Sequence, residues 1–150
     1  MIHKIIALSI CMICFTKTNA QIQNPVVWMA SYKAISANEG EIIITAAIDK
    51  NWHTYSQRPT NDGPIPTSFI FEESKQYVLD GKTEESNAHE EFVKAFDAKI
   101  FVFTDKAEFK QKVKLLDKPG FQIPLKVDYM CCNDMMCLPP KTISLFVKTK

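Results

Sequence analysis

The sequence predicts an all-β protein built as an antiparallel β-sandwich. Two observations lead to this fold class. Stretches in which apolar and polar residues alternate with a period of two recur at roughly ten-residue spacing, and turn-forming residues separate them. About eight short strands at this spacing are typical of a sandwich of immunoglobulin-like type. One segment, residues 84–96, could instead hold a helical turn or two.

The expected strands follow one another along the chain, each showing this alternation. They are residues 26–35, 41–48, 52–57, 67–71, 99–104, 108–115, 121–131 and 142–148. The stretches between them favour turns because they are rich in Gly, Pro, Asn and Asp. These breakers are NEG (38–40), DKN (49–51), RPTNDGPIP (58–66), DKPG (117–120) and LPP (138–140).

Residues 1–20 are expected to be a secretory signal peptide and residues 21–150 a single folded domain. Lys4 gives a positive start, and residues 5–15 form a mostly apolar run that is too short to span a bilayer. Small residues at Thr18 and Ala20 occupy the two positions that a signal peptidase reads. The domain is therefore expected outside the cytoplasm, in a periplasm or secreted from the cell.

The charge of the domain excludes a general polyanion-binding function. The chain has 18 basic and 17 acidic residues, and loss of Lys4 and Lys17 with the leader leaves 16 basic residues and a net charge of −1. Phosphate recognition needs clustered positive charge, so nucleic acid is not an expected partner. We expect a monomer.

All cysteines beyond the leader lie in one short stretch, YMCCNDMMCLPPK (129–141). The strand that leads into it alternates cleanly, and side chains of a strand point to its two faces in turn. Cys131 extends the apolar, core-facing row, whereas Cys132 extends the polar row and is expected to face solvent. Facing therefore favours a Cys132–Cys137 pair and leaves Cys131 as a buried, unpaired thiol.

The residues alone leave three chemistries open for this stretch. A structural Cys132–Cys137 bridge would close only a six-residue loop, worth roughly 2 kcal/mol, so a redox-active pair is an equally good interpretation of the spacing. Three methionines beside three thiols also form a soft ligand set suited to Cu(I). A zinc site would need His53 or His89 as its fourth ligand, and no spacing supports this.

Three patches resemble the N-terminal periplasmic domain of the thiol:disulfide interchange protein DsbD. The first is NWHTYSQ (51–57) leading into GPIPTSF (63–69), the second is AHEEF (88–92), and the third is VDYMCCNDMMCLPPKT (127–142). The third, a strand that ends in Tyr-x-x-Cys followed by a short loop and Cys-x-Pro-Pro, is the most specific. The family fold is an immunoglobulin-like sandwich, in agreement with the strand pattern.

The resemblance implies a protein-disulfide reductase that needs no cofactor and no metal, because its cysteines carry the electrons. Such domains pass reducing equivalents from a membrane-embedded carrier to oxidised proteins outside the cytoplasm, through mixed disulfides. By position, Cys137 is similar to the cysteine that forms the intermolecular bond, and Cys132 to its resolving partner.

The resemblance also assigns neighbours to the cysteine pair. Phe92 matches the aromatic ring of a cap loop that shields the disulfide, and Glu90 and Glu91 match carboxylates that tune the thiols. His53 and Tyr55 fall where the family places aromatic residues beside the active site.

Two departures from the family pattern matter. Better-known members have five residues between the two cysteines, whereas Cys132 and Cys137 have four between them and Cys131 and Cys137 have five. The spacing thus favours a Cys131–Cys137 pair, whereas strand facing favours Cys132–Cys137. The sequence also has no membrane or thioredoxin-like segment after the domain, so we expect the electron donor and the oxidised client proteins to be separate chains. The alternatives are a Cu(I)-binding module and a non-catalytic interaction domain with a structural bridge.

Overall fold

The computed structural model describes residues 23–61 and 63–150, so the expected leader lies outside the described residues. The described chain is almost entirely β-structure, with one short 3₁₀ helix, η1 (Lys94–Phe96), and no α-helix. Its strands are β1 (Val26–Ala34), β2 (Glu39–Ile48), β3 (His53–Tyr55), β4 (Ser68–Phe71), β5 (Tyr77–Ser86), β6 (His89–Val93), β7 (Ala98–Thr104), β8 (Lys106–Leu115), β9 (Gln122–Tyr129), β10 (Cys131–Cys132) and β11 (Lys141–Lys148). In this part of the chain no helix has the length and apolar character needed to cross a membrane.

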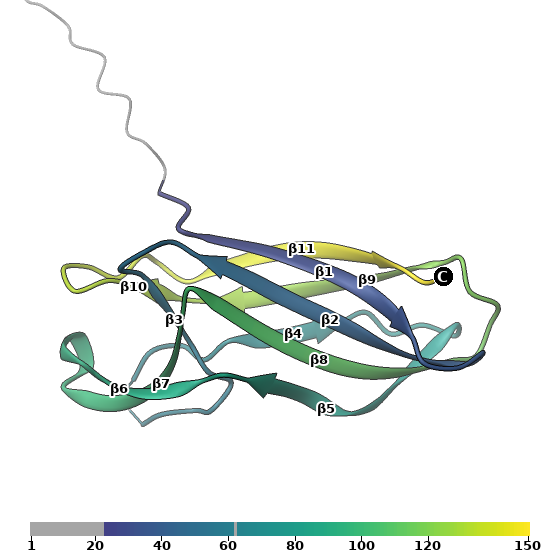
Figure 1. The fold of residues 1–150 in the computed structure, drawn as a ribbon, viewed down its shortest axis with the longest axis horizontal. Coiled ribbons are helices and arrows are strands. Elements are labelled where there is room, and N and C mark those ends of the chain that lie inside the picture. Colours follow the sequence, from purple (N-terminus) through teal and green to yellow (C-terminus); the bar gives the residue numbers. More distant parts are fainter. Residues whose placement is uncertain (1–22, 62) are drawn as a thin grey trace, which may run out of the picture.

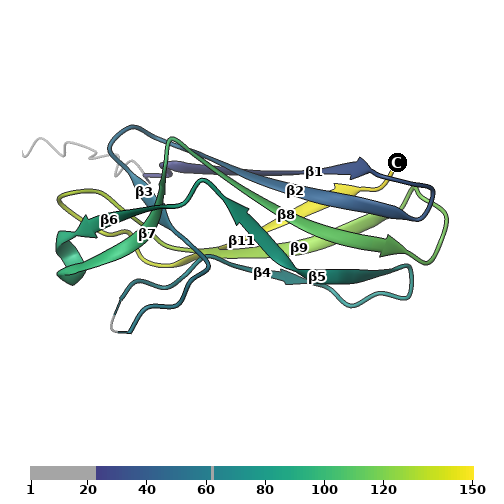
Figure 2. The same ribbon diagram turned by 60° about the horizontal axis from the view of Figure 1, so that its bottom comes forward.

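The strands form three antiparallel sheets. One has the order β1-β2-β8-β5, the second β11-β9-β4, and the third β10-β3-β7-β6. The first two face each other along the length of the molecule, and β1 lies beside β11 where they meet. The third sheet, which holds Cys131 and Cys132, lies at the end of the molecule opposite the C-terminus (Figures 1 and 2). The predicted all-β antiparallel sandwich is therefore confirmed.

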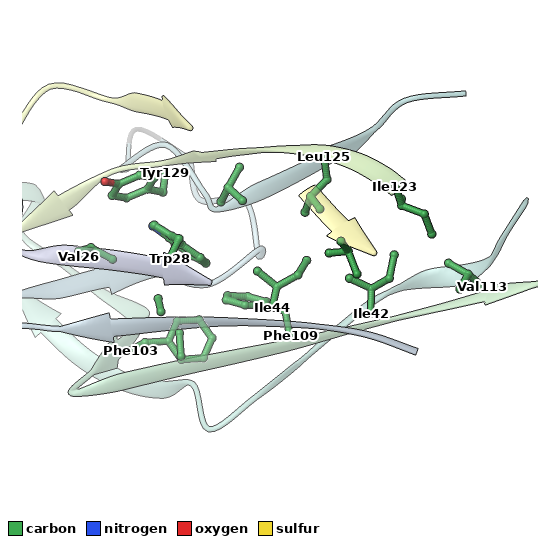
Figure 3. Packing of buried hydrophobic residues seen from close by; sticks show 14 of the residues in the cluster. Val26, Trp28, Ile42, Ile44, Phe103, Phe109, Val113, Ile123, Leu125 and Tyr129 are labelled. Atoms are coloured by element: carbon green, nitrogen blue, oxygen red, sulfur yellow. The ribbon is translucent and has the colours of Figure 1, made fainter. Parts of the chain in front are cut away.

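The core fills the space between the two long sheets. Inward-facing residues of β2 and β8, such as Ile42, Ile44 and Phe109, meet Leu125 and other residues of β9, as Figure 3 shows. These side chains come from alternate positions because successive residues of a strand point to opposite faces. The period of two that predicted the fold is thus the period of burial.

Two strands were missed by the sequence prediction. Residues 84–86 end β5 and residues 89–93 form β6, so the expected helical turns in 84–96 are limited to η1. The register of β5 against β8 shifts between Asp80 and Glu84, and Gly81 in this bulge has a φ of 76°. A bulge adds a residue to one strand and so breaks its alternation. Most side chains of β5 and β6 are also exposed, so apolar residues do not mark these strands.

Glu85, on β5, anchors the start of the loop that follows β3. Its carboxylate accepts hydrogen bonds from the Ser56 hydroxyl at 2.5 Å and the Gln57 amide at 2.8 Å, and it lies 3.5 Å from the Arg58 guanidinium. Arg58 in turn lies 3.9 Å above the ring of Phe101 on β7. This largely buried carboxylate joins the first sheet to the third.

Candidate active site

The cysteine stretch folds into a tight hairpin closed by a disulfide. Cys132 and Cys137 are paired across the hairpin and bonded to each other, with their Cα atoms 4.0 Å apart. On one side of the pair the Asn133 amide donates to the Met136 carbonyl at 2.9 Å, and on the other the Leu138 amide donates to the Cys131 carbonyl at 2.9 Å. The two cysteines thus occupy a position without direct backbone hydrogen bonds between them, where facing residues come closest.

The side chain of Asn133 holds the turn of this hairpin. Its Oδ1 accepts hydrogen bonds from the amides of Met135 and Met136 at 2.9 and 2.8 Å. An Asn side chain that bonds amides two or three residues ahead mimics a backbone turn. Because none of these bonds involves sulfur, we expect the turn to keep the two cysteines together when the disulfide is open.

Cys131 and Cys132 lie on opposite faces of the third sheet. Cys131 joins the main core and is unpaired, as strand facing predicted. Cys132 lies on the other face, but it does not face solvent: it is 0% exposed. That part of the prediction was wrong because Cys132 packs in a second buried cluster with Val93 of β6 and with Ile100 and Val102 of β7, and Phe96 of η1 packs against this cluster. Cys137 is only partly buried against this cluster.

Cys131 is a poor candidate for exchange. It is 4% exposed, and burial raises the pKa of its thiol from 9.0 to about 11, with Lys141 opposing the shift. Exchange needs an accessible thiolate. In the structure the disulfide joins Cys132 and Cys137, in agreement with strand facing and against the five-residue spacing.

His53 and Tyr55 lie on the same face of the sheet as Cys132. In the antiparallel pairing of β10 with β3, His53 is the residue directly opposite Cys132. Its Nε2 lies 3.1 Å from the Tyr55 hydroxyl, and Tyr55 belongs to the second buried cluster. Burial lowers the pKa of His53, with Glu91 and Asp134 opposing the shift, and burial raises the pKa of Tyr55 well above its ordinary value.

A hollow of about 270 Å³ lies between the cysteine hairpin and the segment that follows β6. His53, Glu91 and Phe92 line it, together with the turn residues Asn133 to Met136. Phe92 is 54% exposed. Glu90 points elsewhere, because its carboxylate lies 3.5 Å from Lys99 on β7.

The sequence analysis missed two side chains beside the disulfide, Val93 and Phe96. Val93, next to Phe92 on β6, is buried in the cluster with Cys132, and Phe96 of η1 packs against it with its ring 6.1 Å from that of Tyr55. The signal was present in AHEEFVKAF, where the apolar residues are spaced unevenly. Uneven spacing fits a strand followed by a turn, and neither regular period describes it.

No cluster of three or more His, Cys, Asp or Glu side chains suited to a metal ion occurs in residues 23–61 and 63–150. Of the methionines in the copper hypothesis, Met135 is 89% exposed and Met136 is also exposed, whereas Met130 packs against the second cluster. No feature of the site favours the copper alternative over exchange.

Comparison with known proteins gives a family for this arrangement. A family model described as "Thiol:disulfide interchange protein DsbD, N-terminal" matches residues 22–149. No curated protein matches the sequence significantly.

Among solved structures, the N-terminal periplasmic domain of ScsB from Proteus mirabilis is similar at a TM-score of 0.58 and 16% identity, over 82% of this chain and 45% of that chain. The match therefore spans less than half of the length of that solved chain. The reduced DsbD N-terminal domain of Neisseria meningitidis is similar at a TM-score of 0.49 and 14% identity, over 79% of this chain and 83% of that one. At these identities the ScsB likeness concerns the fold, and it agrees with the sandwich described above.

Proposed function

Since the chain belongs to the family of the DsbD N-terminal domain, and is thus a thiol–disulfide exchange domain, we propose that it carries reducing equivalents through Cys132 and Cys137. It takes two electrons from a membrane-embedded or thioredoxin-like donor protein and passes them to oxidised client proteins. The reaction is that of a protein-disulfide reductase. No organic cofactor takes part.

The unequal exposure of the two bonded sulfurs is the observation that carries this proposal. Cys132 is fully buried, whereas Cys137 is partly exposed at the surface of the hairpin. Attack on a disulfide depends on which sulfur a thiolate can reach. Geometry therefore supports Cys137 as the cysteine that bonds the partner protein and Cys132 as the resolving cysteine.

Each half of the cycle is a balanced exchange. A donor thiolate attacks Cys137 Sγ, the bond between Cys137 and Cys132 breaks, and Cys132 leaves with the electron pair and takes up a proton. A second donor thiol then releases the donor as a disulfide and leaves both cysteines reduced. With a client the sequence reverses: Cys137 attacks the client disulfide, and Cys132 then attacks Cys137 and releases the reduced client.

The surroundings of the pair fit this reaction. Phe92 lines the hollow beside the hairpin, and we assign it as a movable cover that a docking partner displaces. Glu91 lines the same hollow, so its charge acts on chemistry there, with Glu90 one residue away on β6. His53 and Tyr55 border the buried sulfur. The exchange is assigned to an extracytoplasmic compartment, most simply a periplasm, because thiol exchange of this kind operates where disulfides persist.

Trapping of the mixed disulfide tests the function. A Cys132→Ser variant, expressed in the native host, keeps the attacking thiol but lacks the resolving one, so it should accumulate covalent complexes that a reductant dissolves. Cys137→Ser should yield none, and Cys131→Ser should behave like the wild type because its thiol is buried in the core.

The outcomes separate the competing functions. Complexes from Cys137→Ser alone would reverse the two roles. A structural bridge predicts no complex from any variant, together with a reduction potential below about −300 mV. Copper bound to protein purified under reducing conditions would revive the metal-binding alternative.

A further inference from the structure

The buried sulfur of Cys132 has a titratable neighbour on the same sheet face. In antiparallel strands, directly opposed residues have Cβ atoms about 4.5–5.5 Å apart with their side chains on one side. His53 is the residue opposite Cys132, and it is 8% exposed. Its imidazole therefore lies beside the cysteine that the exchange function makes the resolving thiol.

The imidazole is held in place by Tyr55. The Tyr55 hydroxyl lies 3.1 Å from Nε2, and its ring meets that of His53 edge-on with centroids 5.3 Å apart. Burial keeps the phenol protonated, and its oxygen can accept the Nε2 hydrogen of a neutral ring, which leaves Nδ1 as the basic nitrogen. His53 also borders two hollows, one towards Phe92 and one towards Trp52, through which it communicates with solvent.

Exchange poses a proton problem at Cys132. As the resolving thiol it attacks only as a thiolate, yet it is fully buried among apolar side chains, where ionisation is disfavoured. Bulk water does not reach it to take the proton. A neutral imidazole beside Cys132 is a base that can take this proton.

We propose that His53 takes the proton of Cys132 during resolution and returns it when the disulfide is reduced, with Tyr55 as the residue that positions the ring. The proposal rests on the exchange function. In resolution, the Cys132 S–H bond breaks and the proton passes to neutral His53. The thiolate then attacks Cys137 Sγ, and the client sulfur leaves with the electron pair. In reduction, Cys132 leaves as a thiolate, and His53 passes to it a proton taken up from solvent through the hollows that it borders.

The charges around His53 suit both directions. The ionisable side chains that share its hollows are Glu91 and Lys94 from the β6 segment, Asp105 after β7, and Asp134 from the cysteine hairpin. His89 on β6 also acts on it. Glu91 and Asp134 stabilise the imidazolium, whereas burial disfavours it, so the ring is neutral at pH 7 and can still accept a proton.

The test uses the reduced full domain and one equivalent of 5,5′-dithiobis(2-nitrobenzoate), followed by stopped-flow absorbance. Attack by Cys137 releases one coloured thiolate, and resolution by Cys132 releases a second in a step independent of reagent concentration. His53→Gln removes the base while keeping a polar side chain. His89→Gln is the matched control, because His89 is an exposed histidine on β6.

For His53→Gln we expect the first release to be unchanged and the second to slow by at least about a hundredfold, the usual contribution of a general base. His89→Gln should leave both releases at the wild-type rate. Tyr55→Phe should slow only the second release, by less than His53→Gln does. A second release that is equally fast in wild type and His53→Gln would overturn the role of His53.

The pH dependence of the second release in the wild type tests the role of His53 as a base even if a variant fails to fold. A neutral imidazole base gives a second release that levels off above about pH 7, because His53 titrates below its ordinary 6.5. Direct ionisation of the thiol would instead make the rate climb about tenfold per pH unit to the thiol pKa, ordinarily about 8.5, and this result would refute the proposal. A wild type with no second release would overturn the exchange function itself.

Discussion

Truncation of Phe92 tests whether this side chain covers the disulfide or is an ordinary surface residue. A buried Phe side chain removes about 150–250 Å² from water, and Phe92 buries a little under half of its own. At about 25 cal/mol per Å² this burial is worth about 2 kcal/mol, which is an upper limit for holding the segment closed over the hairpin. If reduction requires the segment to open, Phe92→Ala should speed reduction by dithiothreitol by about tenfold, since about 1.4 kcal/mol corresponds to that factor.

The matched control is Phe146→Ala. Phe146 lies on β11 and is 63% exposed, so its truncation should cost a similar or smaller amount of stability, a few degrees in melting temperature. It does not line the hollow, and its loss should leave the rate of reduction unchanged. Equal reduction rates for Phe92→Ala, Phe146→Ala and wild type would refute the argument that Phe92 limits access to the disulfide.

Three further predictions follow from the same contacts. Reduction of Cys132–Cys137 should cost only about 2 kcal/mol, because the loop is short, so circular dichroism should show a folded reduced domain, and unfolding on reduction would indicate a structural bridge. The Cys131 thiol ionises near pH 9 in the unfolded chain but only near pH 11 in the folded one. The free energy of unfolding should therefore fall by up to about 2.7 kcal/mol as the pH rises from 9 to 11. Urea unfolding of Cys131→Ala should show a smaller fall, most clearly between pH 9 and 10, before the raised pKa of Tyr55 also lowers stability, and an equal slope in that range would contradict the assignment. Glu85→Ala should lower the free energy of unfolding by about 2–3 kcal/mol, because it removes the hydrogen bonds to the loop after β3. Glu84 is exposed, so Glu84→Ala should lower it little, and equal losses in the two variants would contradict the anchoring role of Glu85.

Local alternation was enough to predict most strands of the long sheets and the place of Cys131. The run from Phe121 to Cys131 keeps one face apolar, and that face is the one buried against β2 and β8. Such a pattern reports only whether a face is covered by something apolar. It correctly separated Cys131 from Cys132, and strand facing correctly chose the bonded pair over the five-residue spacing.

The burial of Cys132 could not be predicted in this way because its cover comes from elsewhere in the chain. Val93 and Phe96 lie some forty residues before it, and they reach it only because β6 pairs with β7 and β7 pairs with β3. The apolar segment that buries Cys132 is small, and most of β6 stays exposed. The face on which Cys132 lies therefore carries mostly polar residues in the sequence. The residues around an active site are thus set by long-range pairing, which a local pattern does not encode.

The position of Cys131 and Cys132 on opposite faces has a consequence for the order in which the chain folds and its disulfide forms. In an unfolded chain Cys137 can join either Cys131 or Cys132, because the two loops differ by only one residue. Once β10 has paired with β3, the sheet itself separates Cys131 from the other two. Formation of the Cys132–Cys137 bridge is therefore favoured once the sheet has formed, so a newly made chain benefits from remaining reduced until it has folded.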